Sequence, residues 1–395
     1  MKIHLVRRPP ATRLVSRLGC PFVGYCPLRG YDADGDPTRS ATTTLQRWRG
    51  EPALTRQAAI NGRHRGLLAA ASVLLAVTAA CAASPPGSRS AADRETVIAA
   101  VGDMACDPAD PRFNEGKGTE NNCAAERTSD AVLDDDSLEQ VLLLGDYQYD
   151  CSDPADWKES YDLTWGRLDL PTYPVAGNHE YITGRDAYGD LCPAGNETAE
   201  PYFDYFGSAA HPETLGYYSF DMGGWHLIGL NSNCDAVGGC GSTSPQTKWL
   251  KADMASNTNR CVLAFWHQPL FRGQGTQNGE AFLPWWVVLY EADADVVLNG
   301  HVHNYQRYPA LDPEGFRAQL GITQYTVGTG GEDLTDVQPR SIPAPIAWEK
   351  EFGYLRMTLR PTAWTAEFVS HEGNVLDRSS GTCHRQGPST SPSVP

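Results

Sequence analysis

The stretch QVLLLGDYQY (140–149) joins an apolar run to a polar one and decides the fold. Its first half, QVLLL (140–144), is a short apolar segment bounded by Gly145, which is typical of a parallel strand covered on both faces. Its second half places Asp146 directly after that strand. In open parallel sheets, ligands gather beyond the carboxyl ends of the strands. The stretch therefore predicts an α/β fold with a functional site at the end of this strand.

The same succession of an apolar run and a polar motif occurs four more times. The runs are TVIAAV (96–101), TYPVA (172–176), CVLAFW (261–266) and ADVVLN (294–299). The motifs that follow them are Gly102-Asp103, GNHE (177–180), WHQP (266–269) and GHVH (300–303). If five strands converge on one edge of the fold, these distant motifs come together in one cluster.

Together the motifs supply the donor atoms that a pair of metal ions needs. The candidate ligands are Asp103, Asp146, Tyr149, Asn178, His267, His301 and His303. A phosphate ester repels anionic nucleophiles, and two cations about 3.5–4 Å apart remove that barrier. Oxygen donors, imidazole nitrogens and one carboxylate shared by both ions suit such a pair. The set predicts a two-metal phosphoesterase.

Each motif taken singly has an ordinary structural interpretation. Gly-Asp after a strand is a common turn, GNHE fits an Asn-containing turn, and GHVH fits a solvated strand face. Tyr149 alone is more often a half-buried aromatic residue with a bonded hydroxyl. The ordered set of five motifs, each at the end of a strand, favours the metal site over these alternatives.

In this order the motifs resemble those of the calcineurin-like metallophosphoesterases and, within them, the purple acid phosphatases. The general pattern of the superfamily begins with Asp-x-His, whereas this chain reads Asp103-Met104-Ala105. The purple acid phosphatases also lack that His and instead use the Tyr of GDxxY, which is Tyr149 here. GHVHNYQR (300–307) is similar to their GHxHxYER stretch. The resemblance covers roughly residues 96–370.

The resemblance implies a four-layer α/β/β/α sandwich with two mixed sheets and a dinuclear metal site at the strand carboxyl ends. It assigns the first metal site to Asp103, Asp146, Tyr149 and His303, and the second to Asp146, Asn178, His267 and His301. Asp146 then bridges the two ions. The resemblance also implies Fe(III) beside Tyr149 and Fe(II), Zn or Mn beside Asn178. His179 is expected to be catalytic and to help protonate the leaving alcohol, or alternatively only to orient a ligand.

Three positions depart from the pattern of the purple acid phosphatases. Ala105 stands where they usually have Gly, which is tolerable unless the backbone there needs a positive φ. Gln306 replaces the usual Glu. Gln268 stands where many relatives carry His residues that contact the substrate, so the substrate contacts are left open.

Length and charge place the chain among large globular proteins. It has 395 residues and a formal net charge of −16, although residues 1–66 hold 12 of its 32 Lys and Arg and only 4 of its 48 Asp and Glu. The acidic remainder disfavours DNA or RNA as a partner. Small phosphate esters are the partners that the predicted metal site implies. We expect a catalytic domain at residues 95–380 and a disordered tail at residues 381–395.

An export signal is predicted near the N-terminus. GRHRGLLAAASVLLAVTAACAAS (62–84) has a basic flank, an apolar core and small residues, which predicts a signal peptide at residues 62–83. The apolar run is too short and too rich in Ala for a transmembrane span, with a retained anchor as the alternative. Cys81 fits a lipid anchor of bacterial type, although Thr78 is a weak match. Residues 1–61 indicate either disorder or a start codon placed too far upstream, and the mature protein is expected to be secreted or attached to the cell surface.

Eight cysteines follow Cys81. They are Cys106, Cys123, Cys151, Cys192, Cys234, Cys240, Cys261 and Cys383. An even number in an exported chain predicts up to four disulfides, and none of the eight forms a Cys-x-x-Cys metal motif. Cys234 and Cys240 bracket a Gly-rich loop and are expected to pair, whereas the sequence does not determine the other pairings. Cys261 opens an apolar strand, so a buried free thiol is the alternative for it.

Further elements are predicted between the motifs and after them. Helical spacing occurs at residues 126–135, 154–168 and 244–256, and Ser244-Pro245 fits a cap followed by Pro at the first helical position. Residues 216–232 predict a hairpin with its turn at Gly223-Gly224. Residues 352–378 predict two or three antiparallel strands.

These features predict a secreted, metal-dependent phosphomonoesterase, similar to acid phosphatases, that hydrolyses phosphate esters with a metal-bound hydroxide. Two alternatives stay open. One is a phosphodiesterase of the same superfamily that acts on nucleotides or lipid head groups. The other is a non-catalytic surface protein that binds metal or phosphate.

Overall fold

The structure is a computed structural model that describes residues 94–186, 189–273, 279–337 and 343–385. All of them belong to one compact unit, Ala82–Pro395. The predicted signal peptide and the lipidation site at Cys81 lie outside the described residues. Within the described residues, no helix combines the length and the apolar character that a membrane crossing requires.

One of the two β-sheets has six strands in the order β13-β12-β11-β1-β2-β3. Its strands are β1 (Thr96–Val101), β2 (Gln140–Leu143), β3 (Thr172–Pro174), β11 (Gly353–Arg360), β12 (Ala363–Ser370) and β13 (Val375–Thr382). β1, β2 and β3 run parallel, whereas β11, β12 and β13 join them as antiparallel strands. The sheet is therefore mixed.

The other sheet has seven strands in the order β10-β8-β9-β7-β6-β5-β4. Its strands are β4 (Tyr218–Met222), β5 (Trp225–Gly229), β6 (Cys261–Phe265), β7 (Val296–Asn299), β8 (Tyr305–Leu311), β9 (Ile322–Val327) and β10 (Ala347–Glu349). β5, β6, β7 and β9 are parallel, and β4, β8 and β10 are antiparallel to their neighbours. This sheet is also mixed, as expected.

Alternation of side chains along the strands produces the layers. Leu142 of β2 and Leu263 of β6 meet in a core between the two sheets. Val141 and Leu143, on the opposite face of β2, pack in a second core with Val132 of helix α1. Successive side chains of a strand point to opposite faces. A run without polar residues is therefore apolar on both faces, and each face can pack against a separate layer.

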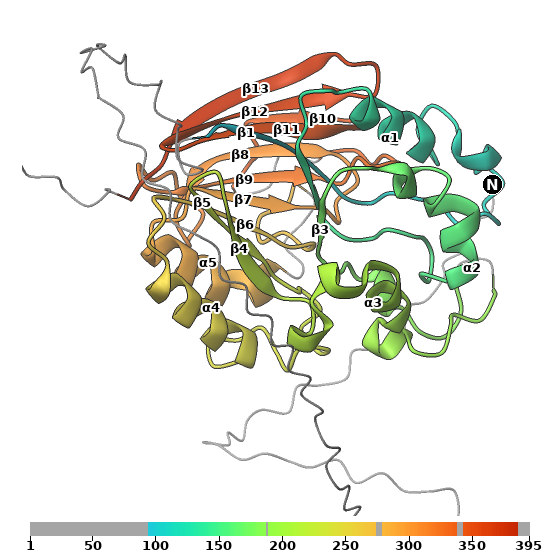
Figure 1. Cartoon of the computed structure of the whole chain (residues 1–395), viewed down its shortest axis with the longest axis horizontal. Helices are drawn as coiled ribbons and strands as arrows, with labels where there is room; N and C mark the ends of the chain where they lie inside the picture. Colours follow the sequence, from blue (N-terminus) through green and yellow to red (C-terminus); the bar gives the residue numbers. More distant parts are fainter. Residues whose placement is uncertain (1–93, 187–188, 274–278, 338–342, 386–395) are drawn as a thin grey trace, which may run out of the picture. The chain divides into compact units, whose positions relative to one another are not determined.

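Helices cover the outer face of each sheet. They are α1 (Ala125–Leu133), α2 (Pro154–Asp156), α3 (Glu200–Phe206), α4 (Pro245–Ser256) and α5 (Leu283–Glu291). Leu250 of α4 and Leu289 of α5 pack with Val262 of β6 in a third core. Figure 1 shows α4 and α5 together beside the seven-stranded sheet, and α1 beside the other. The four-layer α/β/β/α sandwich is thus confirmed.

Local sequence signals place several elements correctly. Ser244 accepts a hydrogen bond from the amide of Thr247, and Pro245 opens α4. The hairpin at residues 216–232 forms as β4 and β5, and Gly223 and Gly224 both take positive φ at its turn. The single helix predicted at residues 154–168 is instead α2, a π-helical turn and a short 3-10 turn, so its continuity is wrong.

The eight cysteines form four disulfides. The pairs are Cys106–Cys123, Cys151–Cys192, Cys234–Cys240 and Cys261–Cys383. The pairing of Cys234 with Cys240 is confirmed, and the alternative of a free thiol at Cys261 is wrong. The bridge to Cys383 follows directly after β13, so ordered structure continues beyond residue 380, where we expected the catalytic domain to end.

Candidate metal centre

The seven candidate ligands lie on loops that follow five parallel strands of both sheets. Asp103 and Asp146 follow β1 and β2, Asn178 follows β3, and His267 and His301 follow β6 and β7. The backbone joins the first two loops directly, since the amide of Asp103 donates to Gly145 O at 3.0 Å. The site therefore forms where the carboxyl ends of strands from two stacked sheets meet.

Tyr149 is at the centre of one half of the cluster. Its hydroxyl oxygen lies 3.1 Å from Asp103 Oδ1, 3.1 Å from Asp146 Oδ2 and 3.0 Å from His303 Nε2. His303 Nε2 in turn lies 3.2 Å from Asp103 Oδ1. Tyr149 is 3% exposed, so these four side chains form a compact group around a buried hydroxyl.

His267 is at the centre of the other half. Its Nε2 lies 2.9 Å from Asp146 Oδ2, 3.1 Å from Asn178 Oδ1 and 3.2 Å from His301 Nδ1. Asp146 Oδ2 thus contacts both Tyr149 and His267. Among the described residues, Asp146, His267 and His301 are a set whose donor atoms all lie within 4.8 Å of one another.

Backbone and carboxylate partners fix the tautomers of two imidazoles. His267 Nδ1 lies 2.8 Å from Leu144 O and donates to it, so in the neutral ring Nε2 carries the lone pair and faces the cluster. His303 Nδ1 donates to Asp333 Oδ1, so its Nε2 does the same. Partners of this kind orient the imidazoles that hold metals in proteins.

The cluster therefore concentrates two buried carboxylates, Asp103 and Asp146, among imidazole and phenol groups, and their negative charge favours a positive charge beside them. Burial lowers the pKa of His267, yet Asp146 and Asp103 raise it more, to about 9. Burial, and then Asp146 and Asp103, raise the pKa of Tyr149 well above its usual range. The phenol thus stays neutral unless a cation lies beside it.

The separations fit metal coordination. Ligand atoms about 2.0–2.2 Å from one ion are roughly 3 Å apart when they occupy adjacent corners of an octahedron. The contacts of 2.9–3.2 Å around Tyr149 and His267 match that edge. Carboxylate, phenol, amide and imidazole donors suit a hard ion together with a borderline one. The residues present fit two metal ions.

Strained backbone holds three of these side chains. Asp103, Asp146 and His301 have φ of 62°, 54° and 70°, a left-handed conformation that costs roughly 1–3 kcal/mol at residues other than Gly. Ala105 does not have a positive φ, which explains why Ala replaces Gly there without strain. A Cβ at Gly177 would lie 2.1 Å from Asp146 Oδ1, so only Gly lets the two loops approach this closely.

Glu180 connects two of the ligand loops, a role that sequence reasoning missed. Its buried carboxylate accepts from the amides of Asp146 at 3.0 Å, Tyr147 at 3.0 Å and Gly177 at 2.7 Å. Burial, and then Asp146, raise the pKa of Glu180 to about 7. The motif GNHE contains the residue, but nothing in the sequence shows which amides it bonds.

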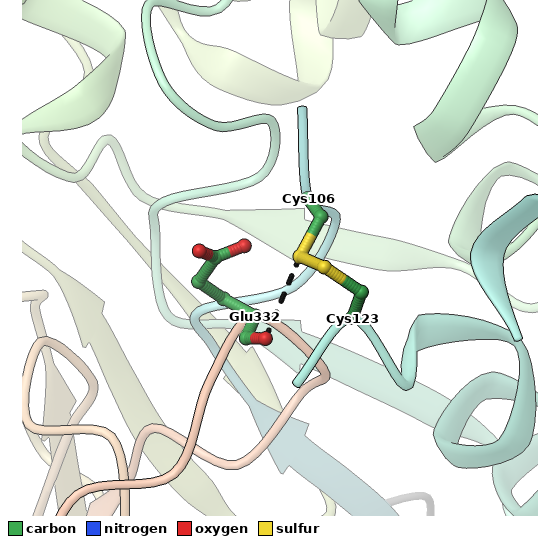
Figure 2. Close-up of side chains that lie close together, drawn as sticks. All are labelled: Cys106, Cys123 and Glu332. Atoms are coloured by element: carbon green, nitrogen blue, oxygen red, sulfur yellow. Dashed lines mark hydrogen bonds between the residues drawn. A yellow bond between two sulfur atoms is a disulfide. The ribbon is translucent and has the colours of Figure 1, made fainter. Parts of the chain in front are cut away.

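The disulfide between Cys106 and Cys123 supports the loop that orients His303. Figure 2 shows Glu332 beside this disulfide. The carbonyl of Glu332 accepts from the amide of Cys123, and its amide donates to Asp103 O at 3.2 Å. Asp333, the next residue, is the partner of His303. Both sulfurs are bonded to each other, so this group is a brace and not a thiolate metal site.

His179 borders the cluster without belonging to it. Its amide donates to Asp146 Oδ1 at 2.8 Å, and its Nδ1 donates to Asp150 O at 2.5 Å. Its ring packs on Tyr149 with the ring centroids 4.1 Å apart. The Nδ1 contact leaves Nε2 of this half-buried ring available to a substrate.

Several other tyrosine and histidine side chains among the described residues have structural roles. Tyr147 is buried and donates to Val175 O at 2.8 Å, and Tyr305 stacks on Phe368. His226 lies between Asp221 and Asp253, outside the cluster. His211 packs on Tyr218.

The chain is similar to known calcineurin-like phosphoesterases and purple acid phosphatases. The sequence model of calcineurin-like phosphoesterases matches residues 97–305. The chain is 26% identical over 341 residues to an Arabidopsis thaliana protein named probable inactive purple acid phosphatase 9, covering 73% of this chain and 50% of that protein. It is 29% identical over 244 residues to purple acid phosphatase 22 of the same plant, covering 55% and 50%. The chain thus spans about half the length of the curated relatives it matches.

A solved structure has the same fold. The purple acid phosphatase from yellow lupin (Lupinus luteus) seeds superposes with a TM-score of 0.61 at 20% identity, covering 73% of this chain and 54% of that one. At this level of identity the likeness concerns the fold alone.

Glu180→Gln is expected to loosen the site. The amide of Gln places N–H groups against backbone N–H groups, so at least one of the three donors loses its acceptor. We expect the free energy of unfolding to fall by about 1–3 kcal/mol and metal affinity to fall about 10–100-fold. Urea denaturation and calorimetric metal titration measure these effects. Glu159→Gln, at an exposed position, is the matched control, and equal behaviour of both variants would contradict the role of Glu180.

Proposed function

Because this chain belongs to the calcineurin-like phosphoesterase family, we propose that it is a secreted, metal-dependent phosphomonoesterase of the purple acid phosphatase type. One observation carries the proposal: contacts of 2.9–3.2 Å link the donor atoms of all seven expected ligands into one cluster. Phosphate esters are the substrates that such a pair of cations suits.

The donor set divides between two cations. Asp103, Tyr149 and His303 would hold the first, Asn178, His267 and His301 the second, and Asp146 would bridge both. A phenolate is a hard anion, so Fe(III) suits the first position, and Fe(II), Zn or Mn suits the second. Bound there, two cations neutralise the charge of the ester and lower the pKa of water.

The residues of the chain have complementary tasks in this mechanism. Asp146 contacts Tyr149 in one half of the cluster and His267 in the other, and so fixes the two halves relative to each other. His179 keeps Nδ1 engaged with Asp150 O, so a proton on Nε2 can pass to the oxygen of the departing alcohol. Glu180 and Asp333 keep the ligand loops and His303 in place.

The complete ligand set supports catalysis over simple binding. One relative bears the word inactive in its name, whereas this chain keeps a donor at each of the seven positions. Export is supported by the four disulfides, because such bridges persist in oxidising compartments. A signal peptide at residues 62–83 and lipidation at Cys81 remain part of the proposal.

The decisive test compares an aryl phosphate monoester with the matching diester. The full-length protein, reconstituted with iron plus zinc or manganese, is expected to hydrolyse the monoester with the higher kcat/KM. Asp146→Asn should lower kcat by at least about 100-fold, since it removes the anion shared by both sites. Diester preference would favour the phosphodiesterase alternative, and near-normal turnover by Asp146→Asn would refute the two-metal assignment.

His179→Ala separates proton donation from ligand orientation. If Nε2 protonates the alcohol, kcat should fall about 100-fold or more for an alkyl phosphate. It should fall far less for p-nitrophenyl phosphate, because nitrophenolate departs without a proton. Steady-state kinetics with both esters measures the difference. An equal loss for both would instead indicate that His179 only orients its neighbours.

Tyr149→Phe tests the phenolate ligand. The iron-loaded protein is expected to absorb visible light through charge transfer from the phenolate, and the variant is expected to lose that band with little change of fold. Absorption spectroscopy and circular dichroism measure the two properties. Tyr205→Phe, at a 39% exposed position outside the cluster, should keep the band. Retention of the band by Tyr149→Phe would exclude the ligand role.

A further inference from the structure

A large cavity adjoins the metal centre on the side of Asn178. Its volume is about 920 Å³, and its walls include Asn178, Tyr181, Asn233, Gln268 and Phe282. Cavities of roughly 300–1,000 Å³ hold organic ligands, far larger than a phosphate group alone. An ester whose phosphate lies at the cations would therefore extend its alcohol portion into this space.

The segments that form the cavity walls are connected to the loops that carry the candidate ligands. Asn233 Nδ2 donates to Gly177 O at 3.0 Å, which ties one wall to the GNHE loop. The disulfide between Cys234 and Cys240 closes the loop that carries Asp235. Gln268 follows the candidate ligand His267 directly in the chain. The position of the cavity relative to the cluster is thus fixed by the same segments that position the ligands.

The charged groups on the walls have one sign. Glu197, Asp235 and Glu280 are exposed carboxylates that line the cavity, and the described lining contains no Lys or Arg. A concave surface lined with carboxylates attracts cations and repels anions. A leaving group with further phosphates is therefore disfavoured.

Aromatic residues complete the chemistry of the walls. Tyr181, a half-buried ring, lines the same cavity as the three carboxylates, whereas Phe282 on the same wall is 2% exposed and packs on Trp285. Aromatic rings together with carboxylates form the environment that binds an ammonium group, because the face of a ring attracts cations. An uncharged alcohol would gain only the apolar part of these contacts.

We propose that this cavity holds the alcohol portion of the ester and selects alcohols that carry an amine, as in phosphocholine and phosphoethanolamine. The inference rests on the proposed phosphatase function and names its substrate class. The cations then act on the phosphate, while Glu197, Asp235 and Glu280 select what is attached to it.

The test compares phosphocholine with 3,3-dimethylbutyl phosphate, its uncharged isostere. The two esters have the same shape, so the part of their difference in kcat/KM that depends on the cavity carboxylates reports recognition of the positive charge. The full-length, metal-loaded protein is expected to prefer phosphocholine on the order of tenfold at low salt. The preference should shrink as salt is raised, because the carboxylates are exposed. p-Nitrophenyl phosphate is assayed alongside as a simple ester.

A double variant, Asp235→Asn with Glu280→Gln, should reduce the preference to about twofold or less. Glu314→Gln removes a negative charge at an exposed position outside the cavity and should leave the preference intact. Equal kcat/KM for the two esters, or a preference that survives the double variant, would overturn the inference while leaving the phosphatase function standing. Failure to hydrolyse any of the three esters would overturn both.

Discussion

The burial of two carboxylates in one cluster, Asp103 and Asp146, is the constraint on which the rest of the structure depends. His267 Nε2 and Asp146 Oδ2 lie 2.9 Å apart, and Tyr149 lies equally close to two carboxylates. Protons on Tyr149 and His267 can satisfy these contacts, and metal ions would replace those protons, but in both cases the fold must keep buried negative charge in place. The stacked sheets, the left-handed loops and the glycines before the ligands all contribute to that hold.

Buried hydrogen bonds supply much of the rigidity. Glu180 accepts from amides of two ligand loops, and Asp333 fixes His303, whose loop the Cys106–Cys123 disulfide braces. Each of these partners is itself held by the backbone or by a covalent bond. The centre is thus organised by the protein, and metal binding need not order the loops.

The ligand cluster and the adjoining cavity differ in the electrostatic field that they would present to a substrate. The ligand cluster concentrates negative charge that the two proposed cations would neutralise, and those cations would attract phosphate locally in an acidic protein. The described lining of the adjoining cavity contains carboxylates and no Lys or Arg. In the proposed reaction the phosphate and the alcohol of one ester would meet opposite electrostatic fields, and specificity would come from segments outside the five motifs.

The sequence by itself determined the parallel strands and the places after them where the candidate ligands lie, and its family resemblance implied the four-layer class. It could do so because apolar runs and the turns after them are local features of the chain. Only the tertiary structure decided the acceptors of Glu180, the partner of His303, three of the disulfide pairings and the cavity walls. It also broke the helix predicted at residues 154–168 and added α3 and α5, which the sequence pattern did not indicate. These features depend on contacts between residues far apart in the chain, and no local pattern encodes which distant groups will meet.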